Sequence, residues 1–477
     1  MKVLFAASEA APFIKTGGLA DVAGSLPKAL VAEGADVRVV MPKFEQIPES
    51  YKLEMEHLCD GYIPVAWRKK YIGIDKLVKD GVTYYFIDNE EYFNRESYYG
   101  YPDDAERFSF FCRGALEIPE ADDFWPDVIH ANDWHAAMLP VLLRLEHIGD
   151  ERYGRIKTLF TIHNLKYQGI FDKEIMHDVL GLDWRYFGNG DLEFFDAVSF
   201  MKGGIVYADA VSTVSRTYAE EIQYEYYGER LDGLLRSRRD KLSGIVNGID
   251  YDVYNPATDK AIYENFDVSS LHKKLDNKTK LQEELGLPVE RDIPVVAMIT
   301  RLVEAKGLDL VTRIIDELLQ HERLQFVLLG TGDRQYEEWF RELAWRHPTK
   351  AAVHIGFSNQ LAQRIYAGAT FFLMPSSYEP CGLSQIIAMR YGTIPIVRET
   401  GGLKDTVTPF DKYQGNGNGY TFPNINAHEL MYTIKRAIGD AESIETWQQM
   451  VKNAMQTDFS WKQAAGEYLA LYEKLGR

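Results

Sequence analysis

The sequence TGGLAD at residues 16–21 returns as TGGLKD at residues 400–405, near the other end of a 477-residue chain. Each pair of glycines follows a predicted strand or its loop and precedes a segment that can begin a helix. Glycines in such places let backbone N–H groups approach a ligand closely, and a helix N-terminus favours negative charge. One Gly-Gly pair more often marks only a tight turn. Two such loops, each accompanied by cationic residues, predict two similar domains that face one anionic ligand.

Outward from these loops, short apolar runs alternate with helical stretches along the whole chain, which is the pattern of βα units. Buried parallel strands are typically continuous apolar runs. In the first half, strands are predicted at residues 2–7, 36–41, 83–87, 127–130, 158–162 and 210–213. After about residue 243 the alternation begins again, with predicted strands at 294–300, 325–329, 351–355, 370–374 and 393–397 and helices at 308–319 and 361–367. The predicted fold class is therefore α/β, with two Rossmann-like domains.

The domain boundary is expected near IVNGID (245–250), because Asn-Gly marks a turn. We therefore expect an N-terminal domain over residues 1–243, a C-terminal domain over 244–457 and a final helix over 458–477. Six apolar residues recur at helical spacing in that last stretch: Trp461, Ala465, Tyr468, Leu469, Tyr472 and Leu475. In open α/β sheets, ligands bind at the carboxyl ends of the strands where the strand order reverses. Two such domains side by side are expected to form a deep cleft.

Composition narrows the class of protein. A formal net charge of −18 disfavours non-specific binding to nucleic acid or anionic membranes. The first residues, MKVLFAASEAAPF, are predicted to be a strand entering a loop rather than a signal peptide, and no run reaches the ~18 apolar residues of a membrane span. The three cysteines, Cys59, Cys112 and Cys381, are widely separated, which suggests a reducing compartment. A cytoplasmic protein without nucleic-acid or membrane partners is expected.

Two cations follow the predicted strand PVVAMIT in the sequence TRLVEAKG (300–307). Arg301 and Lys306 together can neutralise a diphosphate, the arginine as a fork and the lysine as a point charge. The alternative is a pair of solvated surface charges.

A carboxylate follows the apolar strand FFLMP, in the sequence SSYEPCGL (376–383). Glu379, between a strand end and a helix start, can bind sugar hydroxyls or stabilise positive charge. It can equally serve only as a helix cap.

Other candidates are less specific. His163 ends the strand TLFTIH, Asp133 lies in HANDWH (130–135), and Lys15 precedes the first Gly-Gly loop. Each of them has an alternative role as a packed or solvated residue. The sequence DYD at 250–252 has the spacing of metal-binding sugar transferases, but no hydrophobic strand leads into it and a solvated turn is favoured. No metal site is expected elsewhere.

Taken together, the motifs resemble those of bacterial glycogen synthases, a family of sugar transferases that also includes plant starch synthases. The matching stretches occur in the right order from residue 2 to about residue 407. They are KTGGLADV (15–22), PDVIHANDWH (126–135), TIHNLKYQG (161–169), IVNGID (245–250), TRLVEAKGLDL (300–310), SSYEPCGLSQ (376–385) and TGGLKDTV (400–407).

The resemblance implies a pair of Rossmann-like domains of the GT-B type, with the final helix crossing back to the N-terminal domain. It also implies retaining transfer of glucose from ADP-glucose to the non-reducing end of an α-1,4-glucan such as glycogen, without a metal or other cofactor. Arg301 and Lys306 would hold the diphosphate and Glu379 would contact the glucosyl ring. His163 and Asp133 would line the glucose and acceptor side.

The remaining residues that the resemblance implies are substrate contacts. Phe357 would stack on the adenine, and Asn247 would lie near the hinge and the donor. The others would contact the donor through side chains or backbone: Lys15, Gly17, Gly18, Cys381, Gly382, Leu383, Thr400, Gly401 and Gly402.

The sequence departs from the broader pattern at Ile387, where many retaining transferases carry a second Glu. This weakens a two-carboxylate mechanism and favours front-face displacement, although double displacement stays open. The competing functions are a related transferase that uses UDP-glucose or a small acceptor such as fructose, a non-catalytic glucan-binding protein, and a phosphorylase with a pyridoxal cofactor. The cofactor of the last has no recognisable motif here.

Overall fold

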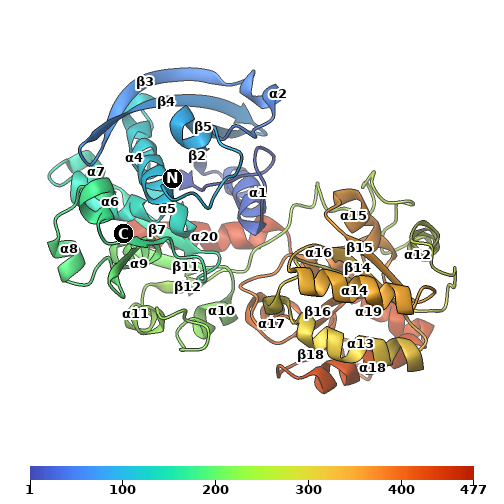
Figure 1. The fold of residues 1–477 in the computed structure, drawn as a ribbon. Helices are drawn as coiled ribbons and strands as arrows, with labels where there is room; N and C mark the ends of the chain where they lie inside the picture. The colour runs from blue at the N-terminus through green and yellow to red at the C-terminus, as the bar shows by residue number, and fades with distance from the viewer. Residues whose placement is uncertain (477) are drawn as a thin grey trace. The chain divides into compact units, whose positions relative to one another are not determined.

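The computed structural model describes residues 1–476, and the chain divides into two compact units. The first unit comprises Met1–Asn247 and the C-terminal segment that begins at Trp461, and the second comprises Gly248–Ser460. Figure 1 shows α/β layers in both, and the red helix α20 (Trp461–Gly476) belongs to the first unit. The predicted α/β class with two Rossmann-like domains is confirmed.

The first unit is built on a sheet with the strand order β12-β11-β7-β6-β1-β2-β5-β4-β3. The strand order reverses between β1 and β6, which pair with each other in parallel. The edge at the carboxyl ends of these two strands is therefore where a ligand site is expected. The strands are β1 (Lys2–Ala6), β2 (Asp36–Pro42), β3 (Glu56–Val65), β4 (Arg68–Lys79), β5 (Val82–Asp88), β6 (Val128–Asn132), β7 (Lys157–Ile162), β11 (Ala210–Thr213) and β12 (Leu242–Gly244).

The six strands predicted for this half are present, but the hairpin β3–β4 was not predicted. It pairs antiparallel within itself and with β5, whereas the other neighbours in this sheet pair in parallel. Exposed and half-buried polar residues interrupt β3, and four lysines interrupt β4, so neither strand has the continuous apolar run of the central strands. A small antiparallel sheet was also missed; it consists of β8 (Ile170–Asp172), β10 (Ala197–Ser199) and β9 (Glu193–Phe194).

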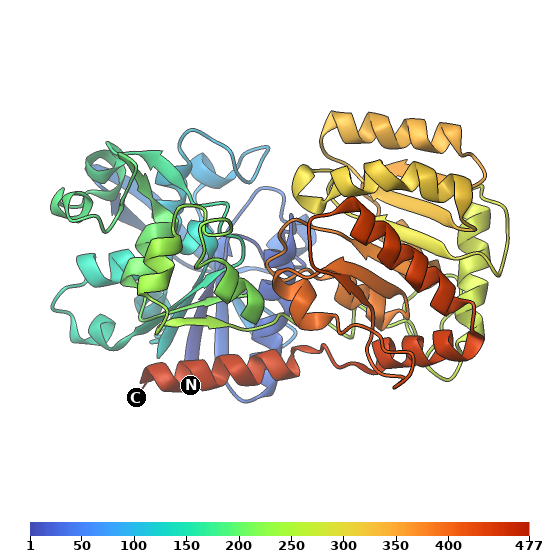
Figure 2. The ribbon, with the colours of Figure 1, turned by 90° about the horizontal axis from the view of Figure 1, so that it is seen from below.

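Helices cover the faces of the first sheet. The C-terminal helix α20 lies against α1 and β7, as Figure 2 shows. Its buried Tyr472 hydroxyl lies 2.7 Å from Nδ1 of buried His130 on β6, which fixes the helix to the sheet. The other helices of the unit are α1 (Gly18–Ala32), α2 (Glu49–Lys52), α3 (Glu90–Phe93), α4 (Asp104–Ala121), α5 (Asp133–Ala136), α6 (Met138–Glu146), α7 (Glu151–Arg155), η1 (Met176–Leu180), α8 (Arg185–Gly188), α9 (Phe200–Tyr207), α10 (Arg216–Glu221) and α11 (Asp232–Ser237).

The second unit has an all-parallel sheet in the order β15-β14-β13-β16-β17-β18. The order reverses between β13 and β16, so the ligand edge of this unit is expected where those two strands end. The five strands predicted for this half are present. The strands are β13 (Val295–Ile299), β14 (Gln325–Gly330), β15 (Ala351–Ile355), β16 (Phe371–Met374), β17 (Ile394–Arg398) and β18 (Tyr420–Phe422).

Amphipathic helices flank this sheet. In α13 (Leu308–His321) the buried residues Leu308, Val311, Ile315 and Leu318 recur every three or four positions, so one face of the helix packs in the core. None of the helices in residues 1–476 is both long and apolar enough to cross a membrane. The other helices of the unit are α12 (His272–Glu284), η2 (Glu304–Lys306), α14 (Arg334–Arg346), α15 (Asn359–Gly368), α16 (Ser384–Arg390), α17 (Gly401–Thr406), α18 (Ala427–Ala441) and α19 (Ile444–Gln456).

Candidate active site

Three of the predicted site residues of the second unit follow β13 or β16, the two strands between which its strand order reverses. Arg301 follows β13 and is exposed, and Lys306 ends the short helix η2. Glu379 follows the neighbouring strand β16. The Lys306 Nζ lies 2.6 Å from Oε2 of Glu379, and both side chains are mostly buried. A carboxylate and an ammonium in this geometry hold each other in place, so Lys306 is not the solvated charge that the sequence left open as an alternative.

Glu379 is also held by the loop that carries it. The Ser376 hydroxyl donates to Oε2 of Glu379 over 3.1 Å. The loop that carries both residues is anchored by Arg398 of β17, whose Nε donates to the Ser376 carbonyl at 2.8 Å and whose Nη2 donates to the Ser377 carbonyl at 2.5 Å. Sequence analysis missed Arg398. The signal that could have found it is an arginine ending an apolar strand, because a buried arginine requires partners.

The second Gly-Gly loop packs directly on this carboxylate loop. Gly401 has φ +45°, and a Cβ added to it would lie 1.9 Å from the Glu379 carbonyl oxygen. A Cβ on Gly402 would lie 2.1 Å from the carbonyl oxygen of Cys381. The Gly402 N–H donates to the carbonyls of Glu379 and Pro380 at 3.2 and 3.1 Å, so this donor is engaged within the protein. The two loops therefore form one tightly packed unit.

The rest of the predicted residues in this unit lie around that core. Buried Thr400 donates its N–H to the carbonyl of Arg398, and the reduced Cys381 is buried. The Gly382 carbonyl accepts from Nε2 of Gln385 at 2.8 Å, and Leu383 is the residue before α16. Phe357, between β15 and α15, is 79% exposed, so its ring is open to a planar ligand.

In the first unit, the loop after β1 is organised by a residue that sequence analysis did not select. Glu9 is 4% exposed, and its Oε2 accepts the Thr16 N–H at 2.6 Å. Burial raises the pKa of this carboxyl, while the N–H of Thr16 opposes that rise. Lys15, the residue before Thr16, has its Nζ 2.7 Å from Oδ1 of Asp21. The signal for Glu9 was an acidic residue immediately after an apolar strand.

The start of α1 differs from the packed loop of the second unit. Gly17 precedes the helix with φ −161°, a conformation open to any residue, and Gly18 is its first residue. A Cβ on Gly17 would meet nothing within 4 Å, and no side chain caps the helix. The first turn of α1 thus leaves room for a ligand beside a helix N-terminus.

Asp133 and His163 come together at the ends of β6 and β7. Oδ1 of Asp133, a residue with φ +56°, accepts the His163 N–H at 2.7 Å. Burial raises the pKa of Asp133 to about 7, against the opposing effect of the N–H donors of His163 and Asn164. Burial lowers the pKa of His163 to about 3, so its imidazole is neutral at pH 7.

The tautomer of His163 follows from its partner. Nδ2 of Asn132 donates to the carbonyls of Ala6 and His130, so Oδ1 of Asn132 is an acceptor. His163 Nε2, 2.9 Å from that oxygen, therefore carries the proton. Its Nδ1 is left as a hydrogen-bond acceptor.

Asn247 is buried at the end of the first unit, and its Oδ1 has no hydrogen-bond partner among the described residues. Such an atom is costly unless a ligand or water binds it. Asp250 and Asp252 lie in a turn, where Oδ1 of Asp250 accepts the Asp252 N–H at 2.8 Å, as the sequence favoured. In residues 1–476, no group of three or more His, Cys, Asp or Glu side chains is arranged to hold a metal ion.

The geometry can now be compared with known proteins. Residues 2–237 match the family model of the starch synthase catalytic domain, and residues 278–457 match the model of glycosyl transferases group 1. The chain is 53% identical to the glycogen synthase of Desulforamulus reducens, across 100% of this chain and 99% of that protein. This chain belongs to the glycogen synthase family. A glycogen synthase of Clostridium novyi is 52% identical across 100% and 99% of the two chains. The resemblance seen in the motifs is confirmed, and the family makes the chain a glycosyltransferase.

Solved structures agree with this assignment. The catalytic domain of starch synthase IV from Arabidopsis thaliana, bound to ADP and acarbose, superposes with a TM-score of 0.91 at 34% identity and covers 100% of this chain and 99% of its own. Sucrose-phosphate synthase from Thermosynechococcus elongatus shares the fold, with a TM-score of 0.62 at 19% identity and coverage of 99% and 98%. Glycogen synthase family members thus share this arrangement of two Rossmann-like units, the GT-B fold.

Proposed function

We propose that this glycogen synthase family member transfers glucose from ADP-glucose to the non-reducing end of an α-1,4-glucan such as glycogen, with retention at the anomeric carbon. The observation that carries the proposal is the mostly buried Lys306–Glu379 pair in the segments that follow β13 and β16, where the strand order reverses and where Arg301 follows β13. It is supported by the starch synthase with ADP bound and by the named glycogen synthases. A non-catalytic descendant would have no need to preserve this charge arrangement.

In the second unit, Arg301 and Lys306 bind the diphosphate and stabilise the charge that develops on departing ADP. Glu379 contacts the glucosyl ring. Its carboxylate is held by Ser376 and by Lys306, and Lys306 is one of the two residues that bind the diphosphate. Backbone groups at Cys381, Gly382 and Leu383 bind sugar hydroxyls.

The nucleotide end of the donor is bound nearby. The exposed ring of Phe357 stacks on the adenine. Thr400, Gly401 and Gly402 form the loop that packs against the backbone of Glu379. Other backbone groups of the same loop contact the phosphate.

In the first unit, Lys15 and the Gly17-Gly18 helix start bind donor phosphate, because the open first turn of α1 favours an anion. Neutral His163 accepts a sugar hydroxyl through Nδ1. Asp133, with its pKa near 7, binds a glucose or acceptor hydroxyl, and Oδ1 of Asn247 accepts from the donor.

The reaction is a front-face displacement. The bond between the anomeric carbon and the diphosphate oxygen breaks as the acceptor 4-hydroxyl oxygen bonds the same face of that carbon. The hydroxyl proton passes to the departing diphosphate oxygen. A covalent sugar intermediate would require a carboxylate as the nucleophile. Buried Ile387 occupies the position where many retaining transferases carry a second Glu, and Glu379 is paired with Lys306, so neither residue favours such an intermediate.

Initial-rate transfer from radiolabelled ADP-glucose and UDP-glucose to glycogen, with EDTA present, tests the proposal. We expect label in polymer, preferentially from ADP-glucose. Preference for UDP-glucose, or transfer only to a small acceptor such as fructose, would replace the donor or acceptor assignment. Absence of transfer by folded protein that binds ADP would indicate a non-catalytic role.

A further inference from the structure

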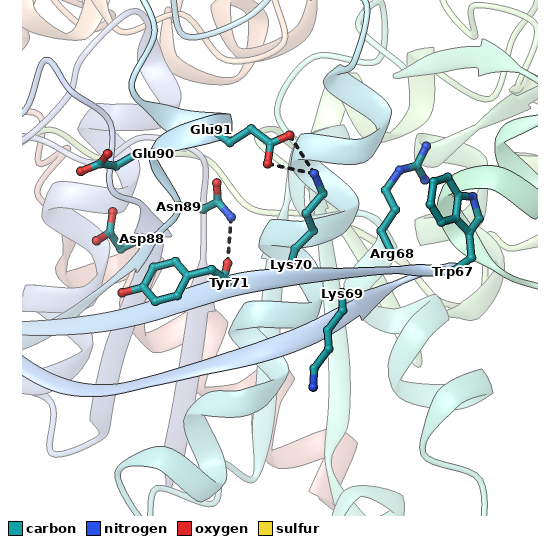
Figure 3. A pocket seen from close by; sticks show the side chains of 9 residues that line it. All are labelled: Trp67, Arg68, Lys69, Lys70, Tyr71, Asp88, Asn89, Glu90 and Glu91. Atoms are coloured by element: carbon teal, nitrogen blue, oxygen red, sulfur yellow. Dashed lines mark hydrogen bonds and ion pairs between the residues drawn. The ribbon is translucent and has the colours of Figure 1, made fainter.

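The Lys306–Glu379 ion pair is short at 2.6 Å, but a short distance alone does not fix two side chains. Figure 3 shows a pair of similar length in the first unit, where Lys70 Nζ lies 2.7 Å from Glu91 Oε1. The side chain of Glu91 is 62% exposed, whereas that of Glu379 is 10% exposed. An exposed pair contributes only about 0–1 kcal/mol, because solvent screens it and holding two long side chains costs entropy. The geometry of the buried pair depends instead on the segments that carry its two residues.

Close contacts join the segment of Lys306 to the loop that follows β16. The Ser377 N–H donates to the carbonyl of Ala305 at 2.9 Å, and the Ser377 hydroxyl donates to the same oxygen at 3.2 Å. A Cβ on Gly307, which has φ +70°, would lie 2.0 Å from the Pro375 carbonyl oxygen. These contacts hold the residues on both sides of Lys306, so the position of its ammonium depends on the loop that follows β16.

Arg398, the last residue of β17, fixes that loop from the other side. Its buried guanidinium donates to the carbonyls of Ser376 and Ser377, through Nε at 2.8 Å and Nη2 at 2.5 Å. Its Nη1 donates at 3.2 Å to the carbonyl of Pro423, the residue after β18. Because β17 lies between β16 and β18 in the sheet, one planar guanidinium ties the ends of both neighbouring strands together. A lysine is a point charge on a flexible stem and does not reproduce this fork.

The other end of β17 has a second buried cation, Lys274 of α12. Its Nζ donates to the carbonyl of Ala367 at 2.9 Å and to the hydroxyl of Thr393 at 2.8 Å. Thr393 immediately precedes β17, so Lys274 lies at the amino end of the strand and Arg398 at its carboxyl end. Both cations bind backbone carbonyls in the interior of the same unit. They differ in what they hold, since Lys274 holds the end of α15 and Arg398 holds the loop of Glu379.

We propose that Arg398 is a positioning residue for the transfer reaction. By holding the loop that follows β16, it sets the distance between Lys306 and Glu379. This role rests on the proposed function, and Arg398 acts through the loop rather than by contact with the sugar or the diphosphate. Donor binding draws on many other contacts, so loss of the guanidinium lowers turnover more than donor affinity.

Kinetics of two variants of Arg398 test this role. Arg398→Lys should lower kcat about tenfold to 100-fold, because a misplacement of about 1 Å at the reacting groups can reduce the rate 100-fold. The Kd for ADP, measured by calorimetry, should change far less. Arg398→Ala should lose more turnover, and millimolar guanidinium should restore part of it by binding in the vacated space.

Lys274→Met is the matched control, because it removes a buried cation from the opposite end of β17. It should melt at a lower temperature than the wild type and keep wild-type kcat. Wild-type kcat in Arg398→Lys, or an equal loss of kcat in Lys274→Met, would overturn the proposal, since Arg398 would then only stabilise the fold. A higher KM for ADP-glucose with unchanged kcat would also overturn it, because Arg398 would then belong to donor binding.

Crystal structures of the wild type and Arg398→Lys separate this proposal from the proposed function. The distance from Lys306 Nζ to Glu379 Oε2 should be longer in Arg398→Lys than the 2.6 Å of the wild type. An unchanged distance would overturn the positioning role even if the wild type transfers glucose. If the wild type transfers no glucose to any acceptor, the proposed function fails, whereas a longer distance in the variant would still show that Arg398 positions the pair.

Discussion

The two Gly-Gly repeats share five of six residues but are built differently. At residues 400–405, Gly401 has φ +45° and its hydrogen lies against the Glu379 carbonyl, where a Cβ would approach to 1.9 Å. At residues 16–21, Gly17 has an extended backbone and open space where its Cβ would be. The second loop needs glycine to fold. The first does not, so the reason for glycine there lies in what approaches it.

This difference gives the two repeats different roles: the second supports the loop of Glu379, and the first is open to contact with a ligand. The second repeat fixes the loop of Glu379, and its helix α17 has only six residues. The first repeat begins the 15-residue helix α1, whose N-terminus has no side-chain cap. A long helix with an open N-terminus suits an anionic ligand, whereas a packed turn suits the positioning of another side chain. The same motif therefore predicts two different consequences of substitution.

The largest effect is expected at the side chain that the second repeat supports. Glu379→Ala should lower kcat about 100- to 1,000-fold, because a carboxylate at the reacting sugar stabilises the transition state more than the ground state. ADP-glucose binding, measured by calorimetry, should change far less. Glu304→Ala, an exposed carboxylate on η2, is the control and should keep wild-type turnover. A loss confined to KM would contradict the catalytic role.

The comparison itself is tested by Gly401→Ala. The added Cβ must displace the Glu379 carbonyl and adopt a left-handed backbone, so the free energy of unfolding should fall by about 2–4 kcal/mol. Turnover should fall with it, because the loop of Glu379 shifts. Denaturant titration and initial rates provide both readouts. Wild-type stability in this variant would show that the loop is less tightly packed than the structure indicates.

Asp133 of the first unit should make the stability of the fold depend on pH. Burial raises the pKa of this carboxyl to about 7. Its unfolded pKa is near 4, so the protonated form stabilises the fold below about pH 4 and this stabilisation is lost as the pH rises through about 7.

The Asp133→Asn variant lacks this titration. Between about pH 5 and pH 8 the stability of the wild type should therefore fall relative to the variant by about 2–3 kcal/mol. Denaturant titrations at the two pH values provide the measurement. A difference that does not depend on pH would mean that Asp133 stays ionised in the folded protein.

The smallest effect is expected at the first repeat. Gly17→Ala should leave the free energy of unfolding within about 0.5 kcal/mol of the wild type, since its Cβ meets no atom within 4 Å. The KM for ADP-glucose should rise about tenfold, because the methyl group occupies the space of the ligand. Thermal melting and donor titration measure the two quantities. Lower stability with an unchanged KM would reverse the assignment of the two repeats.

Sequence patterns predicted the central strands because parallel strands buried on both faces must be apolar throughout. They failed at β3 and β4, because exposed and half-buried polar residues interrupt β3 and lysines interrupt β4. In the candidate site, Arg301, Lys306 and Glu379 were predicted because they lie in the segments that follow apolar strands. Glu9 and Arg398 were missed, since their partners are backbone groups that are distant in sequence or carry no side-chain signal.

The sequence by itself determined the two α/β units, the family and the residues that bear charge at the strand ends, because periodicity and local motifs are properties of neighbouring residues. Only the tertiary structure decided which of them pair and how deeply each is buried. The adjacency of β13 and β16 pairs Lys306 with Glu379, and burial sets the protonation of Asp133 and His163. The packing of Gly401 on a carbonyl 22 residues earlier makes one repeat structural. Contacts between distant segments depend on how strands are ordered in a sheet, which local pattern does not encode.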